Sequence, residues 1–132
     1  MKKQKAQTGI VVWNIGYQGR TLEQFIDVLR QAGVTLLVDL WEKPYSRMAG
    51  FSKNVLRHGL EAAGIAHRGM GATLGGLSCT EDLWKEGCKE LAALAQHHAV
   101  AMMCLEREAS RCHRRKLAAI LESQYGIASV SL

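Results

Sequence analysis

Residues 99–115 read AVAMMCLEREASRCHRR, and this stretch decides which fold the chain adopts. Its first half is an uninterrupted apolar run, which is typical of a β-strand buried on both faces of a parallel sheet. Its second half places cysteines, glutamates, arginines and a histidine in a short connection that leads into a helix. Such a connection lies at the carboxyl edge of a parallel sheet, where open α/β proteins bind ligands. The stretch therefore predicts an α/β fold with a functional site at that edge.

The rest of the chain alternates between strand and helix patterns. Strands are expected at residues 9–15, 34–40, 65–70, 99–105 and 127–132, with helices between them. Thr21 and Gln24 form a capping box that opens the first helix, and Gly33 supplies the left-handed residue that ends it. The glycine-rich residues 69–76 are expected to form a loop. This alternation predicts a single three-layer, Rossmann-like domain over residues 1–132, with a mostly parallel five-stranded sheet and a disordered tail at residues 1–8.

Charged residues near the ends of the first, second and fourth strands suggest how the strands are ordered. We expect these three ends to meet, with the first strand between the second and the fourth. The predicted order is therefore 3-2-1-4-5. The connections after these strands would then converge on one cleft at the switch point between the first and fourth strands.

Composition limits the classes of function. The chain has 132 residues, of which 48% are hydrophobic, and this fits one domain with a conventional core. Its net charge of +5 favours anionic small molecules or nucleic acid as partners, although ordinary solubility charge explains it equally well. No apolar stretch approaches the roughly 20 residues that span a bilayer. We expect a cytoplasmic protein with reduced cysteines and no membrane partner; no particular cofactor or oligomeric state is indicated.

Three separated motifs resemble those of one known family. They are GYQGRT at residues 16–21, VDLWEKPYSRMAGFSK at residues 38–53, and a Cys-x-Glu pair followed by Cys-His-Arg within residues 104–114. Together they resemble the uncharacterised bacterial proteins grouped as domain-of-unknown-function family 488, in the same order and over nearly the whole chain. The resemblance implies an α/β domain and no established activity. One position departs from the family pattern, since Trp41 stands where the family usually has arginine. If that arginine holds an anionic ligand, Arg47 and Lys53 are the residues that would compensate for its loss.

The Cys112-His113-Arg114 sequence lies at the start of a predicted helix. Free backbone N–H groups and the helix dipole favour anions there, and a thiol placed there beside arginines has a lowered pKa. The motif is interpreted as a reactive thiolate or an anion-binding turn, with a merely solvated basic turn as the alternative. Cations at a helix start oppose the dipole, which favours a bound anion nearby.

Two carboxylates end predicted strands, namely Asp39 and Glu106. A carboxylate at the end of a buried strand requires an arginine or a metal ion as its partner. For Glu106 we expect Arg20, Arg47 or Arg114. Asp39 is interpreted either as a catalytic or ligand-orienting group or as a structural acceptor for the loop that follows.

The leading hypothesis is an enzyme or ligand-binding domain that acts on a phosphate-bearing substrate, such as a nucleotide or a nucleic-acid end. Cys112 would be the nucleophile, and Glu106 or Asp39 would be the general base or orienting group. The predicted ligand-binding residues are Tyr17, Arg20, Arg47, Lys53, His113 and Arg114.

Two other hypotheses stay open. One is a zinc or iron site, whose candidate ligands are Cys104, Cys112 and His113 together with Glu106 and Asp39. The other is a nucleic-acid-binding module without catalysis, for which affinity would fall steeply with salt. The remaining histidines lack ligand spacing and are interpreted as surface or hydrogen-bonded side chains: His58, His67, His97 and His98.

Overall fold

A computed structural model of the chain describes residues 9–16, 19–40, 53–74, 80–104 and 114–132. The predicted tail at residues 1–8 lies outside these ranges. Within them, no helix combines the length and the apolar character needed to cross a membrane.

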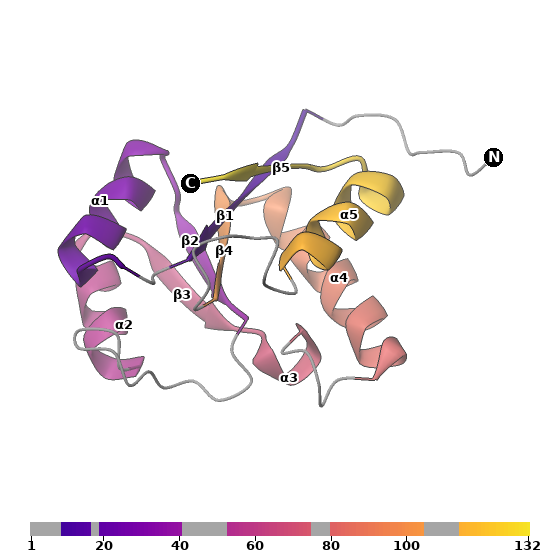
Figure 1. Ribbon diagram of the computed structural model, residues 1–132, viewed down its shortest axis with the longest axis horizontal. Helices are drawn as coiled ribbons and strands as arrows, with labels where there is room; N and C mark the ends of the chain where they lie inside the picture. Colours follow the sequence, from indigo (N-terminus) through magenta and orange to yellow (C-terminus); the bar gives the residue numbers. More distant parts are fainter. Residues whose placement is uncertain (1–8, 17–18, 41–52, 75–79, 105–113) are drawn as a thin grey trace.

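The described residues form a five-stranded sheet whose strands all pair in parallel (Figure 1). The strands are β1 (Val11–Gly16), β2 (Leu36–Asp39), β3 (Ala66–Gly69), β4 (Val100–Cys104) and β5 (Ala128–Ser131). The helices are α1 (Leu22–Gln31), α2 (Lys53–Ala62), α3 (Gly71–Leu74), α4 (Glu81–Ala95) and α5 (Arg114–Tyr125). The predicted α/β class and the parallel sheet are confirmed.

The strand order is β3-β2-β4-β1-β5, so the predicted order was wrong in the middle, where β1 and β4 exchange places. The reason lies in burial. Every residue of β4 from Val100 to Met103 is at most 2% exposed, whereas β1 leaves Val11 and Trp13 partly exposed. The continuously apolar strand therefore takes the central position, where both faces are covered. The charged strand ends do not distinguish the two orders. In both orders β1, β2 and β4 occupy three consecutive positions in the sheet, so their ends lie close together either way.

Helices cover both faces of the sheet (Figure 1). On one face, α1 and α2 contribute Phe25, Leu29, Leu56 and Leu60 to a cluster that includes Leu37 of β2. On the other face, α4 and α5 contribute Trp84, Leu91, Leu117 and Leu121 to a cluster that includes Met102 of β4. The amphipathic helices thus bury one apolar stripe each against the sheet, and this gives the predicted three layers.

The local signals at the ends of α1 are confirmed. Thr21 accepts a hydrogen bond from the backbone N–H of Gln24, while the Gln24 side chain accepts one from the backbone N–H of Thr21. After the helix, Gly33 has a φ of 77°, a left-handed conformation that side chains with a Cβ disfavour. These two features set the length of α1.

Part of the glycine-rich stretch that was expected to be a loop forms the short helix α3. Its Leu74 side chain is fully buried and packs against Gly87 of α4. A Cβ atom at position 87 would lie 2.7 Å from Leu74 Cγ, so α3 approaches α4 closely because residue 87 is glycine. This long-range contact stabilises a helical turn that glycine content alone argues against.

Candidate functional site

The ends of β2, β4 and β1 lie side by side at the carboxyl edge of the sheet. Asp39 of β2 pairs with Met103 of β4, and Met103 pairs with Ile15 of β1. Since neighbouring strands are about 4.8 Å apart, the Cα atoms of Asp39 and Ile15 are separated by about 10 Å. The connections that follow these three strands therefore begin within one small area.

The helices after β1 and β2 pack on one face, and the helix after β4 packs on the other. The helix that follows the central strand thus lies on the opposite face of the sheet from the helices that follow its two neighbours. In open α/β sheets, such divergence is the arrangement that creates a ligand-binding crevice.

Most of the predicted site residues belong to the connections at this edge. Lys53 begins α2, Arg114 begins α5 and Cys104 ends β4, but only the backbone of these three residues is described. The others lie outside the described residues: Tyr17, Arg47, Glu106, Cys112 and His113. Their predicted roles stay predictions.

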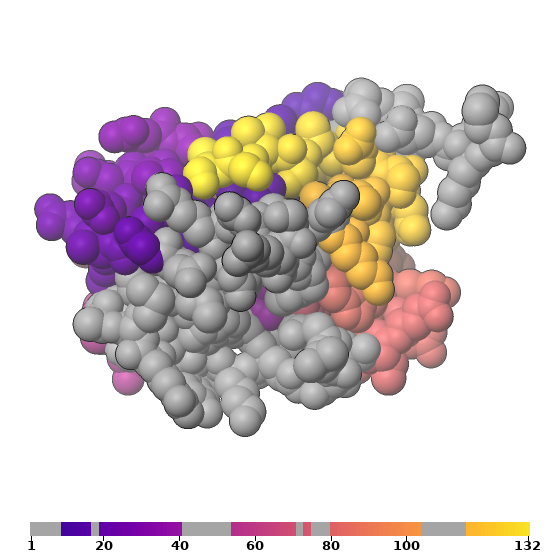
Figure 2. Space-filling view, viewed as in Figure 1, coloured from indigo at the N-terminus to yellow at the C-terminus, as the bar shows by residue number. Residues whose placement is uncertain are grey.

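Arg20 is partly buried, and its guanidinium connects two distant parts of the chain. Its Nη2 atom donates a hydrogen bond to the backbone carbonyl oxygen of Leu132 at 3.1 Å. In Figure 2, the C-terminal residues in yellow extend toward the indigo start of α1. At least one nitrogen of Arg20 therefore has a structural role, while its predicted contact with a ligand stays a prediction.

Asp39 is the predicted site residue whose side chain is best described. It is buried at the end of β2, and its backbone carbonyl accepts a hydrogen bond from the N–H of Met70 at 2.8 Å. The Oδ2 atom lies 3.6 Å from Nε2 of His67 on β3, and both side chains are less than a tenth exposed. The carboxylate is thus held at the carboxyl edge with an imidazole beside it.

His67 was expected to be a surface or a satisfied histidine, and the structure rules out the surface position. Its side chain is buried, and among the described residues Nε2 has no hydrogen-bond partner. The sequence signal that could have revealed it is the register between strands. His67 pairs with Leu37, two residues before Asp39, so both polar side chains lie on the same face of the sheet. Three further histidines, His58, His97 and His98, are exposed as expected.

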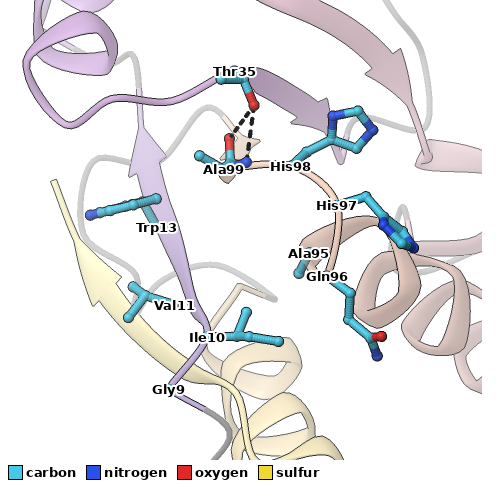
Figure 3. A pocket seen from close by; sticks show the side chains of 10 residues that line it. All are labelled: Gly9, Ile10, Val11, Trp13, Thr35, Ala95, Gln96, His97, His98 and Ala99. Carbon is cyan, nitrogen blue, oxygen red and sulfur yellow. Dashed lines mark hydrogen bonds between the residues drawn. The ribbon is translucent and has the colours of Figure 1, made fainter.

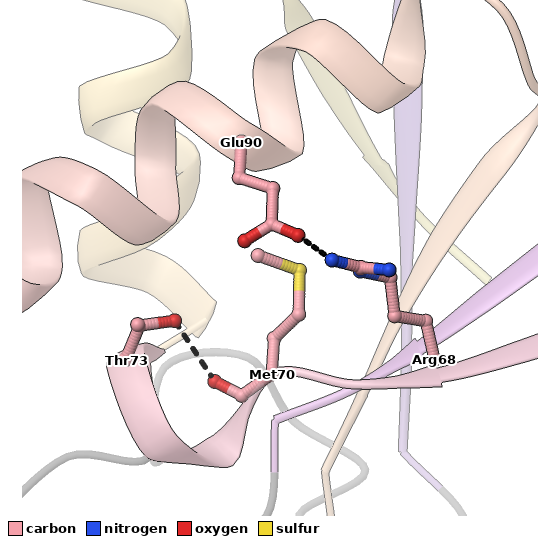
Figure 4. Close-up of polar contacts among 4 residues, drawn as sticks. All are labelled: Arg68, Met70, Thr73 and Glu90. Atoms are coloured by element: carbon pink, nitrogen blue, oxygen red, sulfur yellow. Dashed lines mark hydrogen bonds and ion pairs between the residues drawn. The ribbon is translucent and has the colours of Figure 1, made fainter.

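Arg68 follows His67 in β3 but lies on the opposite face of the strand, as the pleat requires. It forms an ion pair with Glu90 of α4 (Figure 4). Its positive charge is therefore directed to the other layer of the molecule. The Asp39–His67 pair is separate from this exposed ion pair.

Among the described residues, no three histidine, cysteine, aspartate or glutamate side chains are grouped closely enough to hold a metal ion. Asp39 and His67 provide only two donors. The predicted metal ligands Cys112 and His113 lie outside the described residues, as does the side chain of Cys104. The metal-site hypothesis therefore stays a prediction.

A shallow hollow of about 520 Å³ lies at the other, amino-terminal edge of the sheet (Figure 3). Residues 9–11 and Trp13 form one side, and Thr35 with residues 95–99 forms the other. The Thr35 hydroxyl already accepts a hydrogen bond from the N–H of Ala99 at 2.9 Å. This hollow is remote from the strand ends that carry the predicted site, and it contains none of the predicted residues.

Comparison with known proteins gives one family. The profile described as "Domain of unknown function DUF488" matches residues 21–82 and 77–121, which together make up more than half of the chain. The matched region extends from the cap of α1 into α5 and includes Asp39 and His67. No curated protein matches the sequence.

Proposed function

Because the chain belongs to the DUF488 family of domains of unknown function, we propose a function from its own residues. The domain binds a phosphate-bearing ligand at the carboxyl edge of β1, β2 and β4, and Asp39 acts there as a proton acceptor.

The observation that carries this proposal is the position of Asp39. It is a buried carboxylate at the end of an interior strand, in the same row as Met103 of the neighbouring β4 and Ile15 of β1, the next strand beyond β4. Burying a carboxylate is unfavourable, and apolar residues fill most of the surrounding sheet. A carboxylate kept at the edge where α/β proteins bind ligands is placed to remove a proton from a bound hydroxyl or water.

The sequences that follow these strand ends support an anionic ligand. Residues 41–52 include Arg47, residues 105–113 include Arg107 and Arg111, and α5 begins with Arg114 and Arg115. The planar guanidinium group matches phosphate oxygens in a bidentate geometry. The N-terminus of α5, which follows β4, adds backbone N–H groups that favour negative charge. Cys112 and Glu106 remain candidate catalytic residues in the same connection.

The proposal is tested by measuring thermal unfolding with inorganic phosphate and with a set of nucleotides and phosphorylated metabolites. At about 100 times its dissociation constant, a ligand stabilises the folded state by about 2.7 kcal/mol. The variant Arg114→Ala is expected to bind the best of these probes about 10- to 100-fold more weakly, because it removes a charge-assisted hydrogen bond. Arg30→Ala is the matched control, since Arg30 is exposed in the last turn of α1, away from the carboxyl edge.

Two results together would overturn the proposal. The wild type would show no stabilisation by any phosphate-bearing probe, and Arg114→Ala would unfold. The arginines would then be structural partners of the carboxylates. A steep loss of affinity for single-stranded DNA or RNA with rising salt, without binding of small phosphates, would instead favour a nucleic-acid-binding module.

A further inference from the structure

We propose that β5 is an interaction edge for a second copy of this chain, which adds its own β5 as an antiparallel strand and extends the sheet across a two-fold axis. β5 is the last strand at one edge of the sheet (Figure 1), so among the described residues one side of its backbone has no neighbouring strand. The proposal concerns this edge alone and does not depend on the ligand site at the carboxyl ends of the strands.

The backbone groups that β5 directs outward follow from those that it uses to pair with β1. The N–H of Leu132 donates a 2.9 Å hydrogen bond to the carbonyl oxygen of Asn14 on β1. Because these groups alternate in direction along a strand, the N–H and C=O groups of Ser129 and Ser131 point to the open edge. Each of these two serines therefore offers one donor and one acceptor to a further strand.

This edge lacks the features by which proteins prevent strand pairing. Exposed edges are usually protected by charged side chains, by proline or by a β-bulge. Residues 126–132 read GIASVSL, without a charged residue or a proline. The pairing of β5 with β1 is continuous from Ala128 to Ser131, without a bulge. The opposite edge strand, β3, carries Arg68, which is ion-paired with Glu90. β5 is thus the edge that is open to another strand.

Val130 lies at the centre of this open edge, and its side chain is 45% exposed. Among the described residues, Val55 of α2 is the other large hydrophobic residue with such exposure. The strand register places Val130 beside Trp13 of β1, which is partly exposed. Paired residues of neighbouring strands lie on the same face of the sheet, so a strand added beside β5 would cover apolar surface as well as backbone groups.

The β5 strand of a second copy fits this edge because the outward groups are complementary to themselves. In an antiparallel pair centred on Val130, Ser129 of one copy is opposite Ser131 of the other, and the two residues exchange N–H···O bonds. The two-fold axis repeats this pair, so every outward donor meets an acceptor. The Val130 side chains then meet at a non-hydrogen-bonded position, where the Cα atoms approach to about 4.5 Å.

Helix α5 faces the same edge with a side that small residues occupy. It packs beside β5, and Nζ of its Lys116 lies over the ring of Trp84 on α4. Residues two apart in a helix project about 200° from each other, so Ala118 lies on the side of α5 that faces away from α4. That side is directed toward the β5 edge. Antiparallel β5 strands would therefore bring the two α5 helices alongside each other in opposite directions, with Ala118 between them.

The charges of α5 favour this antiparallel arrangement. Its first turn, residues 114–116, is entirely basic, and its one acidic residue, the exposed Glu122, lies in the last turn. Within one helix this distribution opposes the helix dipole. In the antiparallel pair, the basic turn of one copy lies near Glu122 of the other, so that opposite charges meet at both ends. This charge complementarity identifies a second copy as the occupant of the edge.

Sedimentation velocity of the full chain at increasing concentration tests the proposal. Two short strands and one helix contact bury less surface than the roughly 1,200 Å² of stable complexes, so we expect association in the micromolar range. It should stop at the dimer, because two-fold pairing uses the edge of both copies. Val130→Lys places like charges opposite each other and is expected to raise the dissociation constant at least about tenfold. Val55→Lys, at an equally exposed valine, is the matched control and should associate as the wild type does.

A second pair of variants tests the backbone hydrogen bonds. Ser131→Pro and Ser131→Ala both remove the hydroxyl that binds Asn14, but only the proline removes the outward N–H group. We expect Ser131→Pro to lose the dimer and Ser131→Ala to keep it. Circular dichroism and thermal unfolding confirm that each variant is folded. Val130→Cys tests the register, because the expected Cα separation permits a disulfide between two copies at position 130, which peptide mapping would identify.

Loss of the dimer in both Val130→Lys and Ser131→Pro, with both controls unchanged, supports the proposal. A dimer that persists in either variant forms through another surface or register and overturns it. A wild type that is monomeric at every concentration overturns it as well. The edge would then have another occupant, such as residues 1–8 of the same chain or an extended segment of a different protein.

Discussion

The side-chain nitrogen of Asn14 donates a 2.8 Å hydrogen bond to the hydroxyl oxygen of Ser129, joining β1 to the edge strand β5. The Oδ1 atom of the same amide accepts a second bond, of 3.0 Å, from the hydroxyl of Ser131. Asn14 is buried, so both ends of its amide require partners. Two serines spaced two residues apart supply them on one face, and a one-residue shift of β5 would remove both. These bonds therefore favour the observed register of the edge strand.

Replacing Asn14 by alanine is expected to lower the free energy of unfolding by about 1–3 kcal/mol, since two hydrogen bonds are lost from a buried position. Urea denaturation measures this change. Ser129→Ala removes one of the two bonds and is expected to cost about 0.5–1.5 kcal/mol. If Asn14→Ala unfolds at the same urea concentration as the wild type, the amide does not stabilise the β1–β5 pairing.

Gly87 and Gly59 form a matched pair for testing helix packing. Both lie inside helices, where alanine is favoured by up to about 1 kcal/mol. At Gly87 an added Cβ would lie 2.7 Å from Leu74 and Thr73 side-chain atoms, so Gly87→Ala is expected to destabilise the fold by about 1–3 kcal/mol. At Gly59 the close atom is the flexible end of Ile26, at 2.8 Å, so Gly59→Ala is expected to be neutral or stabilising. Thermal unfolding of both variants measures the difference, and equal effects would contradict the close α3–α4 contact.

The Cys88 thiol, in α4, is expected to be unreactive at neutral pH. Burial raises its pKa to about 11, although the charge of Lys116 acts in the opposite direction. At pH 8 this reduces its thiolate fraction roughly 100-fold relative to an ordinary thiol. We therefore expect iodoacetamide to label Cys112 before Cys88 in the native protein, as mass spectrometry of timed samples would show. Lys116→Gln is expected to slow the labelling of Cys88 further. Equal rates for the two cysteines would remove the proposal that Cys112 is an activated nucleophile.

The same thiol makes stability depend on pH in the alkaline range. The folded-state pKa of Cys88, about 11, lies above the ordinary value of 9.0, so the folded state retains the proton more strongly. The raised pKa contributes up to about 2–3 kcal/mol to the free energy of unfolding. This contribution is fully present below pH 9 and is lost as the pH rises toward 11. Urea denaturation at pH 8 and pH 10.5 is expected to show a larger decrease for the wild type than for Cys88→Ala. Parallel decreases would contradict the raised pKa.

Much of the fold could be predicted because its signals are local. The capping box at Thr21, the left-handed Gly33 and the spacing of apolar residues in α1 each depend on only a few neighbouring residues. The order of β1 and β4 could not be predicted in the same way, because it depends on which strand is covered on both faces. That difference becomes clear only when partly exposed residues such as Trp13 are compared with fully buried ones such as Met102.

The candidate site was predictable to a smaller extent. A charged residue that ends an apolar strand was sufficient to select Asp39 and place it at the carboxyl edge. His67 was missed because its importance depends on the register between β2 and β3, which no local pattern specifies. α3 was missed for a related reason, since the fit of Leu74 against Gly87 joins distant parts of the sequence.

The central position of β4 has a consequence for how the chain folds during its synthesis. β1 and β2 are not paired with each other; the sheet joins them only through β4, whose residues follow those of β2 by about 60 positions. Until residues 100–104 have left the ribosome, β2–β3 is the one strand pair of the described sheet that can form. A nascent chain that ends before β4 is therefore expected to be cleaved readily by proteases. Cooperative folding begins late in synthesis, because pairing β2 with β4 requires the closure of a long loop.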